Sequence, residues 1–320
     1  MNYYKIFLKI MRDFDENYSY LKFKKYKPLT LIKKYKNDFK KINNLEKFSK
    51  ILIKILKLFK DPHIRVNYKL NDGEIKSLGT FGENPPKNYN FNLLPKFLSK
   101  ISFQNKIGLI GFYEKILYIN IFSWASSKER EVNNLLNVFE KIIKTKNLKK
   151  IIIDVRSNGG GSDKFTGKFL SYFIPGKEKI LVSKYLFRTN KKDSTKLGKE
   201  YRRYQESGKY FIDAKIVVLI GKNCMSSNEY LIMGFDILRK NKKIILIGDR
   251  TFGSSGNPKI FKYLNGNLEI KIPSWVCCTP EGKLFEGRGV KPDIFISSKK
   301  SIINNHDKVL EKAVNYFSSF

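Results

Sequence analysis

A serine and a glutamate stand where an apolar run gives way to a helical pattern. Ser226 follows the apolar run 215–220, and Glu229 comes three positions later. A serine at a helix N-terminus lies beside unpaired amide donors and the positive end of the helix dipole, which suits a hydroxyl that attacks a carbonyl group. The same Ser-x-x-Glu spacing is also typical of a capping box, in which both side chains only satisfy helix amides. Taken alone, the segment favours capping.

Three consecutive glycines follow another apolar run. Residues 154–161 read Asp-Val-Arg-Ser-Asn-Gly-Gly-Gly, at the end of the strand-like run 151–155. Glycine costs conformational entropy but allows the backbone to approach a ligand, and neighbouring amides can hold an anion or a reaction oxyanion. The Gly-Lys-Ser/Thr ending of a phosphate-binding loop is missing. An oxyanion site and a plain connecting loop both remain open.

The chain contains two histidines, His63 and His306. His63 lies in the segment 59–66, and an isolated histidine is more often structural or exposed than catalytic. His306 lies in a polar stretch beside Asp307 and is interpreted as solvated. Glu286 stands just before a glycine-rich turn, where a carboxylate could orient an imidazole; a surface ion pair is the ordinary alternative.

The elements predicted around these residues alternate between strands and helices. Strand-like runs cover residues 116–122, 151–155, 215–220 and 244–247. Helical patterns lie between them at 132–143 and 230–238, and a strand pair at 259–263 and 268–272 flanks a turn at Asn265-Gly266. Strands separated by helices indicate an α/β core with crossover connections.

The first sixty residues predict helices. From Leu45 to Phe59 the apolar residues recur at helical spacing, and lysines occupy the opposite face. Such a basic amphipathic helix can lie on a membrane surface, but packing on a neighbouring domain is commoner and is what we expect.

The composition predicts a packed protein with a large basic excess. Lys and Arg number 63 against 29 Asp and Glu, which gives a formal charge of +34. This excess could favour nucleic acid, anionic membranes or acidic partners. The basic residues are spread along the chain without a nucleic-acid motif, as drift towards A and T in the coding DNA would produce, so we expect no specific nucleic-acid binding.

The cysteines and the N-terminus carry little information on function. Three cysteines, two of them adjacent, predict neither a disulfide framework nor a zinc site. No apolar run approaches the roughly 18–20 residues of a membrane span. The N-terminal stretch lacks a signal cleavage site, so we expect a cytoplasmic protein as written or one whose upstream leader is missing.

In this order the segments resemble the tail-specific, carboxyl-terminal-processing serine proteases, a family that includes the tricorn-type peptidases. Four family motifs are matched, by residues 154–161, 226–229, 248–253 and 289–294. The Asp61-x-His63 pair and the helical stretch before it resemble the N-terminal part of the tricorn-type branch. The resemblance covers roughly residues 105 to 297 and implies a crotonase-like spiral of ββα units, preceded by a helical N-terminal subdomain.

One departure separates the branches of this family. The processing-protease branch uses a Ser-Lys dyad with the lysine directly after Thr-Phe-Gly, and this position is Ser254 here. A serine cannot serve as the general base. The resemblance to the tricorn-type branch implies that Ser226 is the nucleophile, His63 the general base, and Glu286 the carboxylate that fixes the imidazole.

The same resemblance implies an oxyanion hole and a reaction. The amides of Ser227 and of Gly160 or Gly161 would hold the tetrahedral oxygen. The expected reaction is hydrolysis of a polypeptide through an acyl-enzyme, without metal or organic cofactor, with the substrate bound near its free carboxyl end. The alternatives are a catalytically inactive relative that binds peptides and, less favoured, a basic nucleic-acid-binding protein.

The expected domain organisation follows from these motifs. Residues 1–70 would form the helical subdomain that carries His63, 106–300 the peptidase core, and 301–320 a C-terminal tail or helix. Residues 71–105 would form a linker or short hairpin. The roughly 40 residues between Val66 and Ile107 are too few for the peptide-binding PDZ module of many relatives, because a compact domain commonly needs at least about 50.

Overall fold

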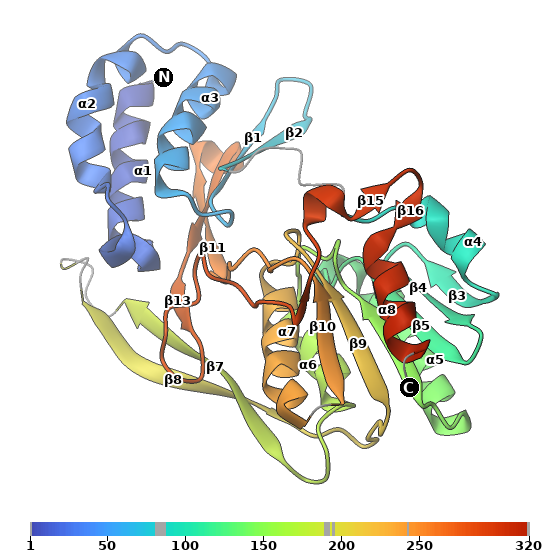
Figure 1. Cartoon of the computed structure of the whole chain (residues 1–320). Helices are drawn as coiled ribbons and strands as arrows, with labels where there is room; N and C mark the ends of the chain where they lie inside the picture. The colour runs from blue at the N-terminus through green and yellow to red at the C-terminus, as the bar shows by residue number, and fades with distance from the viewer. Residues whose placement is uncertain (1, 81–87, 189–192, 194–195, 242, 319–320) are drawn as a thin grey trace. The chain divides into compact units, whose positions relative to one another are not determined.

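The computed structural model describes residues 2–80, 88–188, 193, 196–241 and 243–318, and the chain divides into two compact units (Figure 1). The first, termed the N-terminal unit, comprises Met1–Asn84, Lys184–Tyr201 and Ser254–Cys277. The second, termed the core unit, comprises Pro85–Ser183, Arg202–Gly253 and Cys278–Phe320. Residues 81–87, which belong to the expected linker, lie outside the described part of the chain.

Three helices open the N-terminal unit: α1 (Tyr3–Asn17), α2 (Pro28–Lys40) and α3 (Leu45–Leu56). Aromatic rings join them, since Phe7 of α1 stacks on Phe39 of α2 with 3.9 Å between the ring centroids. The helix predicted from Leu45 is confirmed, and it ends in a 3₁₀ turn at Lys57–Phe59. Its apolar face is buried, as expected for packing within the protein.

A four-stranded antiparallel sheet completes this unit, in the order β11-β12-β1-β2. The strands are β1 (Arg65–Lys69), β2 (Ile75–Gly79), β11 (Pro258–Tyr263) and β12 (Leu268–Pro273). The hairpin predicted around Asn265-Gly266 is confirmed. β1 pairs with β12 from Arg65 opposite Lys271 to Tyr68 opposite Leu268, so the segment after His63 is part of the same sheet as that hairpin.

The core unit contains a seven-stranded sheet in the order β14-β10-β9-β6-β5-β4-β3. The strands, in chain order, are β3 (Lys100–Asn105), β4 (Gly108–Tyr113), β5 (Ile116–Ile121), β6 (Lys150–Asp154), β9 (Lys215–Ile220), β10 (Ile244–Gly248) and β14 (Ile294–Phe295). Neighbours from β14 to β5 are parallel, whereas β4 is antiparallel to both β5 and β3. The four strands predicted in the core are therefore confirmed.

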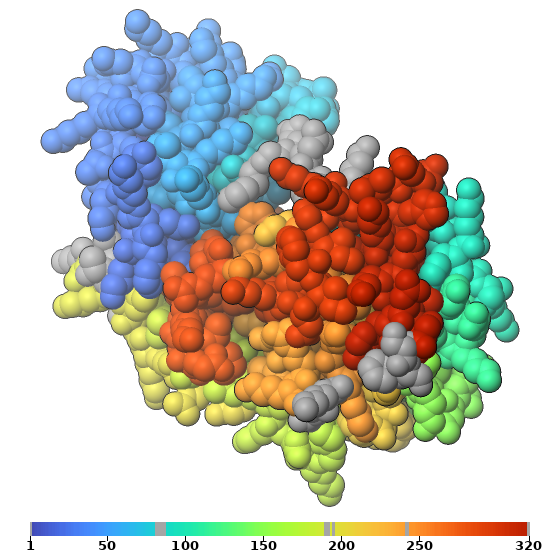
Figure 2. Space-filling model, in the orientation of Figure 1, coloured from blue at the N-terminus to red at the C-terminus, as the bar shows by residue number. Residues whose placement is uncertain are grey.

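Helices cover both faces of this sheet. Consecutive residues such as Ile151, Ile152 and Ile153, whose side chains point to opposite faces, are therefore all fully buried. One face packs on α8 (Lys308–Ser318) and α4 (Leu94–Phe97), whose apolar residues share a cluster with Ile152. In Figure 2 the C-terminal segment (red) lies on the surface of the core unit beside the α4–β3 segment (teal).

Three further helices of the core unit pack together through aromatic rings. They are α5 (Glu129–Thr145), α6 (Asp163–Ser171) and α7 (Ser227–Leu238), in agreement with the predicted helices at 132–143 and 230–238. Phe139 of α5 contacts Phe169 of α6, and Phe173 bridges from there to Phe235 of α7. These ring contacts join the three helices; the candidate site lies at the other end of α7, at its N-terminus.

No pattern in the sequence predicted the third sheet, which has the order β13-β7-β8. Its strands are β7 (Lys179–Arg188), β8 (Leu197–Glu206) and β13 (Trp275–Cys278), and a small hairpin pairs β15 (Ile302–Ile303) with β16 (His306–Asp307). Within the described ranges, no helix has both the length and the apolar character that a membrane crossing requires.

Candidate active site

Ser226 has a strained backbone at the start of α7. Its φ of 59° and ψ of −129° fall in a region that side-chain-bearing residues rarely adopt, and such strain costs on the order of 1–3 kcal/mol. Among the described residues its side chain makes no capping hydrogen bond. Glu229 instead accepts a hydrogen bond from the Gly253 amide at 2.6 Å. The capping box favoured by the local sequence is therefore wrong, because Ser226 makes no capping bond and Glu229 bonds to Gly253 instead.

The glycine loop lies directly against Ser226. Gly160 has a φ of +103°, and a Cβ at this position would lie 2.6 Å from the Ser226 Cβ and 3.0 Å from the Ser227 nitrogen. Gly161 has a φ of +146°, and a Cβ there would meet the Trp124 carbonyl carbon at 2.1 Å. Both positions exclude any side chain, which is the reason that the loop can approach the serine.

The amides around Ser226 differ in their availability. The Gly160 amide donates to Asn158 Oδ1 at 2.8 Å. Within the described part of the chain, the amides of Ser227 and Gly161 have no hydrogen-bond acceptor. Ser227 is the first residue of α7, where the helix itself offers its amide no partner. Two donors are therefore left for a ligand, and Gly160 contributes mainly the close approach.

Two asparagines hold the glycine loop in place. The Asn158 amide group donates to the Ile121 carbonyl at 3.2 Å, at the end of β5. Asn228, in the first turn of α7, donates to the carbonyls of Asn158 and Val155 and accepts from the Trp124 indole. The loop and the start of α7 are thus joined directly, and the sequence offered no specific signal for Asn228.

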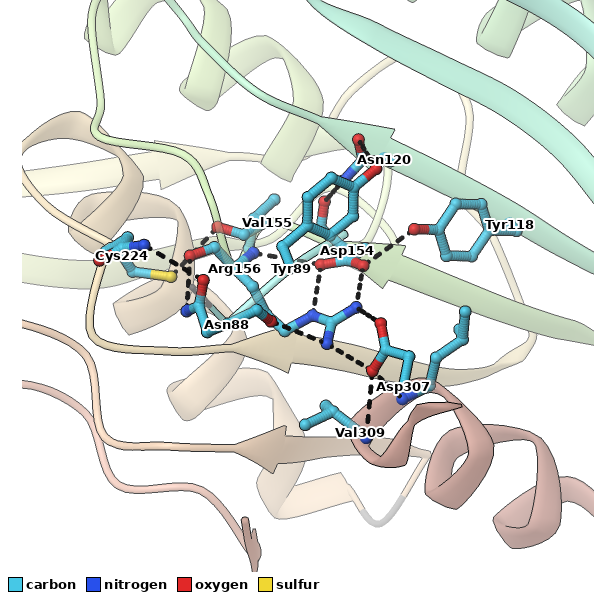
Figure 3. A network of polar contacts seen from close by, with 12 residues as sticks. Asn88, Tyr89, Tyr118, Asn120, Asp154, Val155, Arg156, Cys224, Asp307 and Val309 are labelled. Carbon is cyan, nitrogen blue, oxygen red and sulfur yellow. Dashed lines mark hydrogen bonds and ion pairs between the residues drawn. The ribbon is translucent and has the colours of Figure 1, made fainter. Parts of the chain in front are cut away.

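A buried ion network anchors the start of the same loop (Figure 3). The Arg156 guanidinium is fully buried and forms two-pronged contacts with Asp154 and Asp307, including 2.7 Å from its Nη2 to an oxygen of each. Burial alone would lower the pKa of Arg156, but the two carboxylates outweigh it and raise the pKa well above its ordinary value. Arg156 is therefore a permanent cation beneath the loop.

Asp307 connects this network to the C-terminal helix. Its Oδ1 accepts from the amides of Val309 and Leu310, at the beginning of α8. The sequence shows only a polar stretch at this point, because the burial of Asp307 depends on the packing of α8 on the sheet. His306 beside it is exposed and contacts Glu311 at 2.8 Å, so its predicted solvation is confirmed.

His63 lies in the N-terminal unit, just before β1. Its Nδ1 is 2.8 Å from Ser254 Oγ and 3.6 Å from Asp61 Oδ1. Asp61 is fully buried and accepts hydrogen bonds at 2.9 Å from the Tyr18 hydroxyl and from the His63 amide. Burial raises the pKa of Asp61, but the His63 side chain and amide together with the Lys24 charge outweigh it and leave the pKa below its ordinary value.

Glu286 lies in the core unit, half-buried in a turn. The next residue, Gly287, donates its amide to the Gly253 carbonyl at 2.7 Å. Gly253 is thus fixed through its amide to Glu229 of α7 and through its carbonyl to the Glu286 turn. Ser254, which follows it in the chain, contacts His63 in the N-terminal unit.

Of the six residues predicted for the site, four lie together at the start of α7: Ser226, Ser227, Gly160 and Gly161. A serine with a strained backbone at a strand-to-helix turn has the backbone arrangement that serine hydrolases use at a nucleophile elbow. The family model for peptidase family S41 matches residues 115–296, which is more than half of the chain. The chain belongs to this family.

Relatives of known name agree with this membership. A probable CtpA-like serine protease of Staphylococcus aureus (strain bovine RF122 / ET3-1) is 28% identical over 157 residues, which cover 48% of this chain and 28% of the relative. The chain thus matches less than a third of the length of such curated relatives. Its S41 membership confirms the predicted family resemblance.

Solved structures show the same fold. A protein of Parabacteroides merdae described as a candidate peptidase has a TM-score of 0.78 at 20% identity, covering 99% of this chain and 97% of the other. The photosystem II D1 C-terminal processing protease has a TM-score of 0.51 at 15% identity, covering 98% and 97%. The predicted α/β fold class is confirmed.

Proposed function

We propose that this chain is a serine-type peptidase that hydrolyses polypeptides through an acyl-enzyme. Ser226 is the nucleophile, His63 the general base and Glu286 a carboxylate that stabilises the charged imidazole, as in the tricorn-type branch of the family. The observation that carries this proposal is the strained backbone of Ser226 against Gly160, beside the Ser227 amide, which has no acceptor among the described residues. A backbone that only capped a helix would have no need of that strain.

In the proposed reaction, His63 Nε2 carries each proton that is transferred. His63 Nε2 takes the hydrogen of Ser226 Oγ as the oxygen attacks the scissile carbonyl carbon, and the carbonyl oxygen becomes an oxyanion. The same Nε2 then delivers the proton to the amine nitrogen of the peptide bond. The C–N bond breaks, the amine departs, and the acyl group remains on Ser226 as an ester. Water attacks this ester in a second round with the same proton transfers, and the carboxylic acid product departs.

The oxyanion is assigned to the amides of Ser227 and Gly161. These two donors are unbonded within the described residues, whereas the Gly160 amide already donates to Asn158. Removing one oxyanion donor typically slows the chemical step by about 10²–10³-fold. The Arg156 network and the two asparagines would act by holding these donors in place before the substrate arrives.

The Gly253-Ser254 bond supports the choice of His63 as base. On one side Gly253 is bonded to Glu229, one turn after Ser226, and on the other Ser254 contacts the imidazole of His63. Ser254 occupies the place at which the Ser-Lys branch carries its basic lysine. Where the Ser-Lys branch carries its lysine, this chain carries a serine in contact with a histidine, which supports Ser-His-Glu over Ser-Lys.

The proposed substrate is an extended polypeptide cleaved near its free carboxyl end. The D1 protease, which shares the fold, is named for C-terminal processing. The elbow of this chain matches hydrolysis of an acyl group but does not by itself select a sequence.

Labelling with a fluorophosphonate probe tests the proposal. We expect one adduct, located on Ser226 by peptide mass analysis, that is lost in Ser226→Ala and slowed at least a hundredfold in His63→Ala. Ser127→Ala, which removes an exposed serine hydroxyl, should label like the parent. A folded parent protein that binds peptides but takes up no probe would instead identify an inactive peptide-binding relative.

A further inference from the structure

We infer that Ser254 and Asp61 are positioning residues for His63, which hold its imidazole with the hydrogen on Nδ1 and the lone pair on Nε2. This inference rests on the proposed function for its catalytic meaning, but the contacts that carry it lie entirely within the N-terminal unit. It adds two residues to the three that the family resemblance implies.

The surroundings of Nδ1 decide where the ring carries its hydrogen. Ser254 Oγ lies 2.8 Å from Nδ1, which is a hydrogen-bonding distance, and a hydroxyl can either donate or accept. Asp61 Oδ1 lies 3.6 Å away, too far for a hydrogen bond but close enough for its negative charge to attract an N–H group. The carboxylate therefore favours the Nδ1–H form, and the serine hydroxyl accepts that hydrogen. Nε2 is left as the basic nitrogen that the proposed reaction needs.

The carboxylate of Asp61 is itself fixed in position. It is fully buried, and its two oxygens accept hydrogen bonds from the Tyr18 hydroxyl and the His63 amide. Thr80 donates its hydroxyl to the Asp61 carbonyl and so holds the backbone of the same residue. Besides His63, the positive charge of Lys24 also acts on Asp61. His63 and Lys24 hold the pKa of Asp61 below its ordinary value, which favours a negative charge beside Nδ1.

The ring has little room to turn. The His63 side chain is 11% exposed. A Cβ at Gly256 would lie 3.2 Å from Nδ1 and 3.3 Å from Cγ, so the backbone of Gly256 passes directly over the ring. Ser254 and Gly256 belong to one short segment, which therefore supplies both the hydroxyl at Nδ1 and the wall beside it.

This arrangement explains what a serine does at the place of the catalytic lysine. Ser254 cannot accept a proton from Ser226 at neutral pH, but its hydroxyl can hold the group that does. When His63 becomes positively charged, its Nδ1–H group continues to donate a hydrogen bond to Ser254 Oγ. The negative charge of Asp61 stabilises the resulting cation. The family resemblance implies that Glu286 fixes the imidazole. The contacts at Nδ1 point to Ser254 and Asp61 for the tautomer, and the contribution of Glu286 is tested separately.

Nitrogen NMR of ¹⁵N-histidine-labelled protein tests the inference without relying on activity. The chain has only His63 and His306, so His306→Asn assigns both signals, and the Ser226→Ala background prevents any self-cleavage. We expect His63 to be the Nδ1–H tautomer at neutral pH. Ser254→Ala should shift it towards Nε2–H, whereas Ser254→Thr, which keeps a hydroxyl, should restore Nδ1–H. A parent spectrum of the Nε2–H tautomer, or one that Ser254→Ala leaves unchanged, would overturn the inference.

Labelling kinetics in the Ser226 protein provide the second readout. Ser254→Ala should slow fluorophosphonate labelling about tenfold, the effect of one lost hydrogen bond at its upper range, and Ser254→Thr should recover most of it. Asp61→Asn should also slow labelling, because the imidazolium formed in the reaction loses its negative neighbour. Glu286→Gln should leave the NMR tautomer unchanged; a shift to Nε2–H in that variant would return the role to Glu286.

Two controls separate the possible failures. Ser19→Ala removes another buried serine hydroxyl of the N-terminal unit, bonded to the Trp275 carbonyl at 2.7 Å, and should change neither tautomer nor labelling profile. If the parent never labels although His63 is the Nδ1–H tautomer, the proposed function fails and the positioning stands. If the parent labels but Ser254→Ala and Asp61→Asn behave like Ser19→Ala, the positioning fails and the peptidase stands.

Discussion

Replacing Gly160 with alanine should disable the site through a single methyl group. The new Cβ would lie 2.6 Å from the Ser226 Cβ, 2.7 Å from the Met225 carbonyl oxygen and 3.0 Å from the Ser227 nitrogen. Two of these neighbours are backbone atoms, and the third is fixed by the strained backbone of Ser226. None of them can swing away as a flexible side chain could. The methyl group must therefore push the loop and the start of α7 apart.

Two separate costs contribute to the expected effect. A φ of +103° is unfavourable for alanine, and such a conformation costs on the order of 1–3 kcal/mol. Overpacking against fixed neighbours typically costs another 1–3 kcal/mol or so. The protein can lose this free energy as stability, or it can relieve it by moving Ser226 away from the loop. Each route reduces labelling, and we expect the rate to fall at least about a hundredfold.

Gly282→Ala is the matched control for the backbone term. Gly282 has a φ of +84° in the core unit, but a Cβ there would meet nothing within 4 Å. It should lose stability by the conformational term alone and keep its labelling rate. Fluorophosphonate labelling and urea unfolding are measured for both variants. If Gly160→Ala remains as stable and as reactive as Gly282→Ala, the contact between the glycine loop and Ser226 is not as described.

Three further substitutions test other parts of the machinery. Asp307→Ala leaves Arg156 with one buried carboxylate and should lower the free energy of unfolding by about 3–5 kcal/mol; Glu311→Ala on the exposed side of α8 should change it by no more than about 0.5 kcal/mol, and equal effects would contradict the network. Glu229→Ala leaves the Gly253 amide without its acceptor and should cost about 1–3 kcal/mol, with Glu229→Gln costing less; the reverse order would show that the contact is unimportant. The folded-state pKa of Asp61 lies below its ordinary value, so its stabilisation is complete above about pH 4 and is lost as the pH falls through the lower folded value. The destabilisation by Asp61→Asn in urea unfolding should therefore shrink on acidification below about pH 4, and a gap that widens there would refute this sign.

The parallel strands of the core could be predicted because they are buried on both faces. Ile151 to Ile153 and Val217 to Leu219 are continuous apolar runs, and their neighbours in the sheet are equally apolar. The long strands β7 and β8 gave no such signal, since β8 alternates partly buried and exposed residues and is rich in Lys, Arg and Tyr. Their pairing depends on partners distant in the sequence, which a local pattern does not reveal.

The residue types suggested a chemistry for the candidate site, but they did not predict its geometry. The Ser-x-x-Glu spacing alone pointed to capping, and only the backbone of Ser226 and the Gly253 contact of Glu229 remove that alternative. The sequence also could not predict that the Gly160 amide is already occupied, because its hydrogen bond to Asn158 depends on a side-chain rotamer. Ser254 was recognised as unable to act as a base, yet its contact with His63 spans 191 positions and leaves no trace in either segment.

The N-terminal residues share a sheet and a compact unit with residues from much later in the chain. β1, which begins two residues after His63, pairs with β12, and the segment from Ser254 to Cys277 belongs to the same unit as the first helices. A lysine at position 254 would itself have been a candidate base, as in the Ser-Lys branch. With a serine there, the proposed base must come from residues 61–63, and the sheet that joins β1 to β12 fixes the register between them. The position that carries the lysine in the Ser-Lys branch and the proposed base are therefore in direct contact in this unit, 2.8 Å apart.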